Sequence, residues 1–108
     1  MMNNKSFNNI DEIFDFYRDL KIYGLGVEKS NSDNLIFLKS EPLKYPRTHI
    51  LVERKLNNEF ISLICWNEHK QKYDGLLVKN LEILFNAIND YLYNNSKEFK
   101  IYMNLHKL

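Results

Sequence analysis

The chain has 108 residues and carries 15 Lys and Arg against 14 Asp and Glu, which gives a formal net charge of +1. Its hydrophobic content of 44% and aromatic content of 14% exclude an intrinsically disordered chain. Three Gly, two Pro and one Cys exclude a collagen repeat and a disulfide-stabilised scaffold. We expect a single domain over residues 9–108, preceded by a flexible N-terminus at residues 1–8.

The first predicted element is a helix from about Ile10 to Tyr23. Asn9 can cap it, Glu12 stands three residues further on as in a capping box, and Gly24 suits a left-handed C-terminal cap. Apolar residues recur at helical spacing and form one stripe, made of Ile10, Ile13, Phe14, Tyr17 and Leu20.

The middle of the chain predicts strands. Residues 25–29 and 35–40 are two of them, and the two prolines at 42 and 46 place a loop between the second strand and the next. The clearest feature is a hairpin of residues 48–56 and 59–67 around Asn57 and Asn58, because Asn tolerates the positive φ of a two-residue turn. This turn sets a register in which Val52 pairs with Leu63 and Ile50 with Cys65.

The last third predicts a second helix and a final strand. Residues 68–75 are polar and are expected to be irregular. The helix covers residues 75–95, or residues 76–78 are extended and Asn80 caps a shorter helix. From Glu98 to Leu105, apolar and polar residues alternate, which is typical of a strand.

Together these elements predict an α+β fold in the order α-β-β-β-β-α-β. We expect a mostly antiparallel sheet of four to five strands with two amphipathic helices on one face, because each helix must bury its apolar stripe. The predicted helices are acidic and the predicted strands basic, so the small net charge can conceal a two-sided molecule.

The sheet face opposite the helices is the predicted binding surface. Aromatic and basic side chains should gather there, and this surface could bind a protein or stack the bases of a nucleic acid. The candidate residues are His49, Lys55, Phe60, Trp66, Lys100 and Tyr102. Leu51 and Ile64 on the same face favour a protein partner or a homodimer, because monomers avoid exposed apolar patches.

Two Glu-x-Lys motifs suggest an alternative. Glu53-Arg54-Lys55 follows an apolar strand, and Glu68-His69-Lys70 follows the next one. They resemble part of the PD-(D/E)xK nuclease pattern, in which acidic residues hold a divalent metal ion. The α-β-β-β-α order is also shared with the double-stranded-RNA-binding domain, although only Lys79 is basic at the start of the second helix.

Other site patterns are missing from the sequence. The histidines and the single Cys65 have no zinc-ligand spacing, and no glycine-rich phosphate loop or nucleophile elbow occurs. We therefore predict no cofactor, no metal site and no catalytic residue. No segment reads as a secretory signal or a membrane span, so a cytoplasmic location is expected.

The leading functional hypothesis is a small non-enzymatic protein-binding module that occupies the surface of a partner, as an inhibitor, immunity or accessory factor does. The composition, rich in Asn, Lys and Ile and poor in Ala, suits a phage or mobile-element product. The alternative is a nucleic-acid-binding protein or a metal-dependent nuclease of the PD-(D/E)xK type. Binding that weakens steeply with added salt would favour this alternative.

Overall fold

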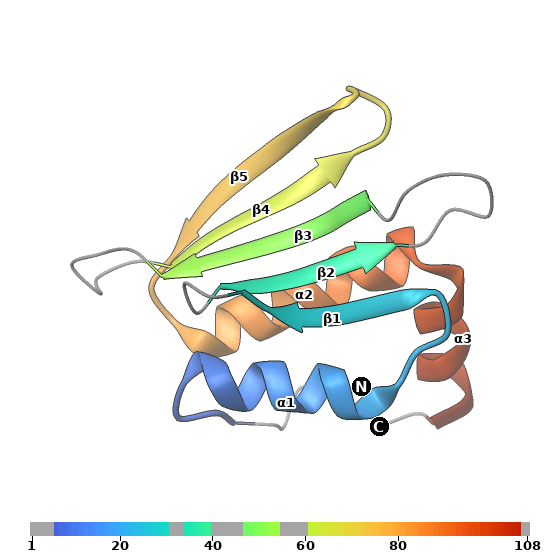
Figure 1. Ribbon diagram of the computed structural model, residues 1–108, viewed down its shortest axis with the longest axis horizontal. Coiled ribbons are helices and arrows are strands. Elements are labelled where there is room, and N and C mark those ends of the chain that lie inside the picture. Colours follow the sequence, from blue (N-terminus) through green and yellow to red (C-terminus); the bar gives the residue numbers. More distant parts are fainter. Residues whose placement is uncertain (1–5, 31–33, 40–46, 55–60, 107–108) are drawn as a thin grey trace.

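The computed structural model describes residues 6–30, 34–39, 47–54 and 61–106 and confirms an α+β fold with an antiparallel sheet (Figure 1). Within these ranges the chain forms five strands and three helices in the order α-β-β-β-β-β-α-α. The elements are α1 (Ile10–Leu20), β1 (Leu25–Lys29), β2 (Leu35–Lys39), β3 (Arg47–Arg54), β4 (Ile61–Asn67), β5 (Lys72–Val78), α2 (Leu81–Asn95) and α3 (Lys97–His106).

Helix α1 begins as the sequence predicts. The Asn9 side chain accepts a hydrogen bond from the Glu12 amide at 2.9 Å, and the Glu12 carboxylate accepts one from the amide of Asn8. The helix ends at Leu20, three residues earlier than expected, because Lys21 takes the left-handed C-cap conformation at φ 52°. The predicted cap residue, Gly24, also has a positive φ, but it lies in the turn before β1.

The sheet has the strand order β1-β2-β3-β4-β5, and every neighbouring pair is antiparallel. The register predicted for the central hairpin is confirmed, since Val52 pairs with Leu63 and Ile50 with Cys65. The predicted turn at residues 57–58 lies outside the described residues. One irregularity interrupts the sheet, where the pairing of β2 with β3 shifts between Phe37 and Leu38.

The order of elements differs from the prediction at both ends of α2. Residues 72–78 form the fifth strand, and the shorter helix capped by Asn80 is the correct alternative. The expected strand at 98–105 is wrong, because this segment is helix α3. Its alternating pattern also contains a helical one: Phe99 is buried and Tyr102 and Met103 pack beside it at i+3 and i+4, whereas Ile101 and Leu105 are exposed.

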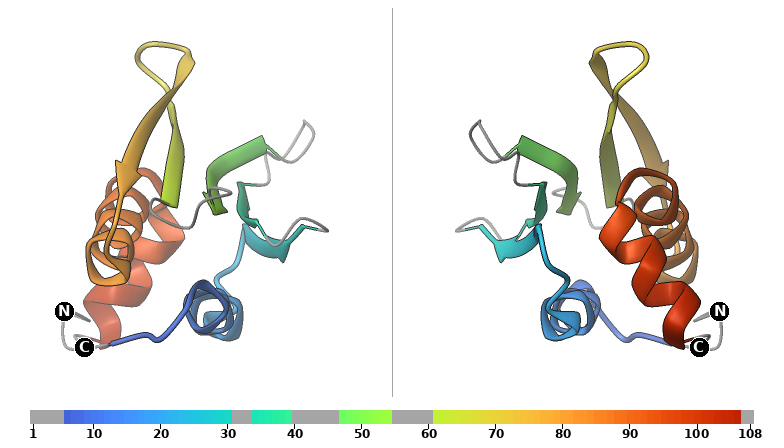
Figure 2. Two further views of the ribbon diagram at one scale, coloured as in Figure 1. Left: turned by 90° about the vertical axis from the view of Figure 1, so that its left-hand side faces the viewer. Right: turned by 90° about the vertical axis from the view of Figure 1, so that its right-hand side faces the viewer.

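All three helices lie on the same side of the sheet (Figure 2). The core fills the space between the two layers, with Phe37, Ile50 and Val52 from the sheet and Phe85 from α2 fully buried. Tyr17 of α1 packs against Phe37 and Phe85, and its hydroxyl donates a hydrogen bond to Asn89 of α2. The helices are therefore tied to each other as well as to the sheet.

Candidate partner-binding site at the β4–β5 hairpin

The hairpin formed by β4 and β5 rises from the body of the molecule at one edge of the sheet (Figures 1 and 2). Asn67 organises its tip: the Oδ1 atom accepts a hydrogen bond from the amide of Lys70 at 3.0 Å, and the Nδ2 group donates one to Asp74 at 2.8 Å. Gln71 takes a positive φ of 54° and closes the turn by donating from Nε2 to the Glu68 carbonyl. The tip is thus held by its own side chains.

The face of the hairpin that points away from the helices is aromatic. Trp66 and Tyr73 are cross-strand partners, and their rings meet edge to face with centroids 4.9 Å apart. The indole nitrogen of Trp66 donates to the Glu68 carboxylate. Leu77 lies further along this face and is 57% exposed. We name Trp66, Tyr73 and Leu77 the outer face.

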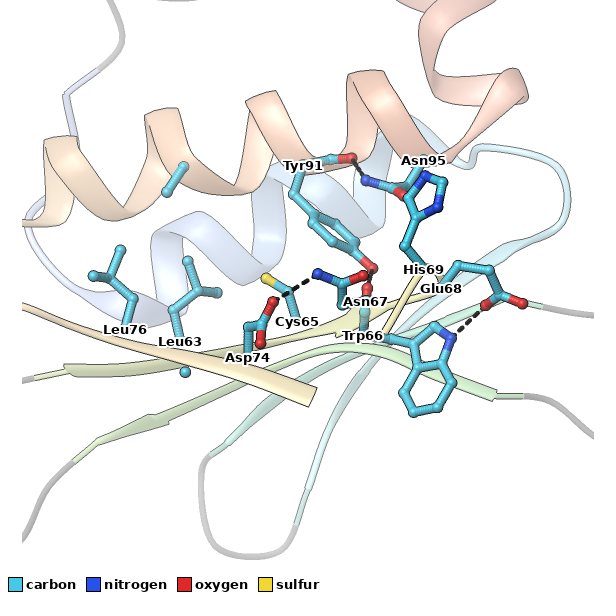
Figure 3. Close-up of a pocket in the computed structure, with 12 residues that line it drawn as sticks. Leu63, Cys65, Trp66, Asn67, Glu68, His69, Asp74, Leu76, Tyr91 and Asn95 are labelled. Atoms are coloured by element: carbon cyan, nitrogen blue, oxygen red, sulfur yellow. Dashed lines mark hydrogen bonds between the residues drawn. The ribbon is translucent and has the colours of Figure 1, made fainter. Parts of the chain in front are cut away.

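The opposite side of the hairpin covers a pocket of about 520 Å³ between the sheet and α2 (Figure 3). Its apolar part is formed by Leu63, Leu76 and Ala87, and its polar part includes Asp74 and Glu68. The pocket deepens toward β4 and opens toward β5, because Leu63 is only 3% exposed whereas its β5 partner Leu76 is 54% exposed. We name this cavity the hairpin pocket.

Tyr91 crosses the hairpin pocket from α2 to the sheet (Figure 3) and donates its hydroxyl hydrogen bond to the carbonyl of Trp66. Burial, followed by the charges of Cys65 and Glu68, raises the pKa of Tyr91. Burial, followed by the charge of Asp74, raises the pKa of the Cys65 thiol from its ordinary 9.0 to about 11. Both pKa values are raised for the same two reasons, partial burial and nearby negative charge. The pocket therefore disfavours additional negative charge.

Strand β5 forms one edge of the sheet, and within the described ranges no strand pairs with its outer side. Six of its seven residues, 72–77, are exposed. An edge strand presents unpaired backbone N–H and C=O groups, which proteins normally protect with charge or cover with another element. Here the strand carries the charged Lys72 and Asp74, and beside them the exposed side chains of Tyr73, Leu76 and Leu77.

The predicted site residues do not all lie together. Trp66 lies on the outer face, and its side chain is half-buried. His49 is only 5% exposed and packs against Tyr91 of α2, with ring centroids 5.0 Å apart, so its predicted exposure on the open face is wrong. The reason is the shift between β2 and β3, where Ile50 pairs with Phe37 but Thr48 pairs with Leu38, leaving His49 as an extra residue.

The other four candidates are not on the described part of the sheet. Lys100 and Tyr102 belong to α3, where the Lys100 ammonium lies 5.3 Å from the Tyr93 ring centroid and the Tyr102 ring meets His106 edge to face. Their predicted place on a final strand is therefore wrong. Lys55 and Phe60 lie outside the described residues.

The two Glu-x-Lys motifs are far apart. Glu53 pairs with Ser62, and Glu68 immediately follows Asn67, the last residue of β4. Asn67 lies five residue steps beyond Ser62 on the same strand, which corresponds to roughly 17 Å along an extended strand. The two carboxylates therefore do not converge on one ion, and among the described residues no three His, Cys, Asp or Glu side chains gather as metal ligands.

Sequence reasoning missed Tyr73 and Asp74 because residues 68–75 were expected to be irregular. It missed Leu76 because this residue was assigned to the second helix or to a short extended segment at 76–78. Had residues 68–71 been taken as a hairpin turn, counting outward from it would have predicted these cross-strand pairs. Trp66 lies opposite Tyr73, Cys65 opposite Asp74 and Leu63 opposite Leu76. The signal was the tight polar turn at 68–71, which can join two antiparallel strands as the Asn57-Asn58 pair was expected to do.

The chain matches no protein-family model, and comparison with curated proteins and with solved structures finds no significant relative. None of the helices in the described ranges has the length and hydropathy needed to cross a membrane.

Proposed function

We propose that this protein is a small non-enzymatic protein-binding module that acts by occupying the surface of a partner, as an inhibitor, immunity or accessory factor does. The observation that carries the proposal is the β5 edge, where exposed Tyr73, Leu76 and Leu77 accompany an unpaired strand edge in the described fold. Large apolar side chains beside polar ones are typical of protein interfaces. The single thiol, Cys65, fits a reducing compartment such as the cytoplasm.

The outer face is the predicted anchor of the interface. Aromatic side chains carry much of the binding energy at protein interfaces, and the edge-to-face pair of Trp66 and Tyr73 is held in place by the ladder and by Glu68. Leu77 extends the apolar surface along the same strand. A rigid aromatic pair loses little conformational entropy when a partner binds.

The experiment is affinity capture from the host cell with matched variants. The double variant Tyr73→Ala/Leu77→Ser should reduce recovery of the captured partner by at least about tenfold, because each change removes an anchor of the interface. Tyr23→Ala is the control, since Tyr23 is 87% exposed in the turn before β1, far from the hairpin in sequence. Equal recovery with both variants would contradict the proposal.

The outer face also bears on the alternative function. Bases could stack on Trp66 and Tyr73, with Lys70 and Lys72 of the same hairpin near the phosphates. In that case the protein would bind single-stranded oligonucleotides, and the affinity would fall steeply between low and physiological salt. Binding of this kind, lost in Tyr73→Ala, would favour nucleic acid over a protein partner.

A further inference from the structure

The hairpin pocket lies directly beside the edge strand β5, and this arrangement indicates what kind of partner segment could bind there. Leu76 and Asp74 stand two residues apart on β5 and both line the pocket. Their side chains lie on the same face of the strand, because side chains alternate with a period of two. A strand added at the β5 edge would therefore direct its own alternate side chains over the mouth of the pocket.

We propose that the partner contributes an extended segment that pairs with β5 as a sixth strand and places an apolar and a basic side chain, two residues apart, in the hairpin pocket. This inference rests on the proposed protein-binding function and deepens it. Main-chain hydrogen bonds along an edge strand provide affinity, and pockets for alternate side chains provide specificity.

The exposed apolar walls of the pocket indicate where the apolar side chain of the incoming segment would bind. Leu63 forms a buried floor, while Leu76 and Ala87 flank the opening on β5 and α2. A branched aliphatic side chain entering there would cover the exposed part of Leu76 and displace water from an apolar surface. Burial of apolar area of this kind stabilises a complex by about 25 cal/mol per Å² before the entropic cost of association is counted.

The basic position is set by charge complementarity. The described lining contains the carboxylates of Asp74 and Glu68 and one histidine, His69, but no Lys or Arg. The charge of Asp74 contributes to the raised pKa of Cys65, and the charge of Glu68 contributes to the raised pKa of Tyr91. Both carboxylates therefore interact electrostatically with groups that line the pocket. A Lys or Arg side chain of the incoming segment would meet this negative field, whereas an acidic side chain would be repelled.

The test uses a phage-displayed library of linear peptides about 12 residues long, enough to span β5 at about 3.4 Å per residue. Selection on the intact protein should enrich peptides with an apolar residue and a Lys or Arg at i and i+2. Ala87→Leu fills the pocket and should weaken an enriched peptide by more than about tenfold, and Asp74→Asn should weaken it about five- to tenfold.

Matched controls separate these effects from general damage. Asn86→Leu places the same leucine side chain at the exposed neighbour of Ala87 on α2, and Glu28→Gln removes an exposed carboxylate from the opposite edge strand, β1. Both should bind the enriched peptide like the natural chain. N-methylation of alternate peptide amides should abolish binding, because it removes the donors of the added strand.

Three outcomes would overturn this inference. The first is enriched peptides that lack the basic residue and bind Ala87→Leu normally. The second is a failure to enrich peptides although host capture still depends on Tyr73 and Leu77; either result leaves the proposed function in place. The third is a dimeric mass in light scattering that Ala87→Leu makes monomeric, since a second copy would then occupy the edge. Loss of both peptide enrichment and host capture would instead contradict the proposed function itself.

Discussion

The two edges of the sheet are built in opposite ways. At the β1 edge, α1 packs alongside the strand, and Lys29 reaches Asp11 of that helix at 2.8 Å. At the β5 edge, the strand rises away from the helices over a pocket, and Leu76 takes the corresponding position in the cross-strand row. A helix and an ion pair therefore protect one edge, whereas the other exposes apolar side chains beside Lys72 and Asp74. This contrast is the reason why we propose the β5 edge as the interface.

The largest expected difference lies within one cross-strand row. Leu63 is buried and its partner Leu76 is exposed, so Leu63→Ala should lower the free energy of unfolding by about 2–5 kcal/mol, whereas Leu76→Ala should lower it by less than about 1 kcal/mol. Urea denaturation of the two variants measures both values. Equal losses would show that β5 is packed like the interior of the sheet and would remove the contrast.

The chemistry of Cys65 tests the electronegative character of the β5 side. Because burial and Asp74 raise its pKa to about 11, the thiolate fraction at pH 8 should be roughly 100-fold lower than in the unfolded chain, where the pKa is 9.0. The folded protein keeps this proton between pH 9 and 11 while the unfolded chain releases it. The associated stability is therefore present below pH 9 and is lost as the pH rises through 11.

The rate of iodoacetamide alkylation, measured against pH on the folded and urea-unfolded protein, follows the thiolate. Asp74→Asn should speed the reaction of the folded protein, since it removes a charge that opposes the thiolate. Glu28→Gln, at the other edge, should leave the rate unchanged. Equal alkylation rates for the folded protein and the unfolded chain at pH 8 would contradict a raised pKa of Cys65 in the hairpin pocket.

A smaller effect is expected where the hairpin is tied to α2. Tyr91→Phe removes the hydrogen bond to the Trp66 carbonyl and should cost about 1 kcal/mol of stability. Hydrogen exchange should quicken in β4 and β5 but not in β1 or β2. A uniform increase across the whole sheet would mean that the hairpin does not open separately.

The smallest effect is expected at the protected edge. The ion pair of Lys29 and Asp11 is partly exposed, so Asp11→Asn should change the free energy of unfolding by only about 0–1 kcal/mol, and added salt should reduce the difference further. Thermal denaturation at two salt concentrations checks this. A loss of several kcal/mol would show that the β1 edge depends on this pair far more than its exposure implies.

Local patterns in the sequence predicted much of the fold. The start of α1 followed from Asn9 and Glu12, whose capping bonds are formed, and the β3–β4 register followed from counting outward from Asn57 and Asn58. These features depend on neighbours a few residues apart. A capping residue or a short turn is a local signal of this kind, and it can be recognised in the sequence without knowledge of tertiary contacts.

The errors arose where tertiary contacts decide the outcome. The alternation from Glu98 to Leu105 fits a strand, yet Ser96 caps a helix there by accepting a hydrogen bond from the Phe99 amide, and Phe99 is buried in the core. His49 moved to the helix side because of a register shift against β2, which no local pattern encodes. The polar start of β5 was taken for a loop, because its strand structure depends on pairing with β4 and not on an apolar pattern of its own.

The same distinction applies to the candidate site. Trp66 was found because a large aromatic residue on a predicted open face stands out in the sequence. Its partner Tyr73 and the pocket residues Leu76 and Asp74 come together only once β5 pairs with β4 and both lie over α2. A site whose residues come together only by pairing of strands is hard to recognise in the sequence of any one strand.

The most direct test is amide hydrogen exchange of the protein with and without the partner captured from the host. Our account predicts that binding slows exchange in β5, at the outward-pointing amides of alternate residues from Lys72 to Val78, and leaves β1 unchanged. Slowed exchange at β1 or α1, with β5 unaltered, would contradict it and move the interface to the opposite edge of the sheet.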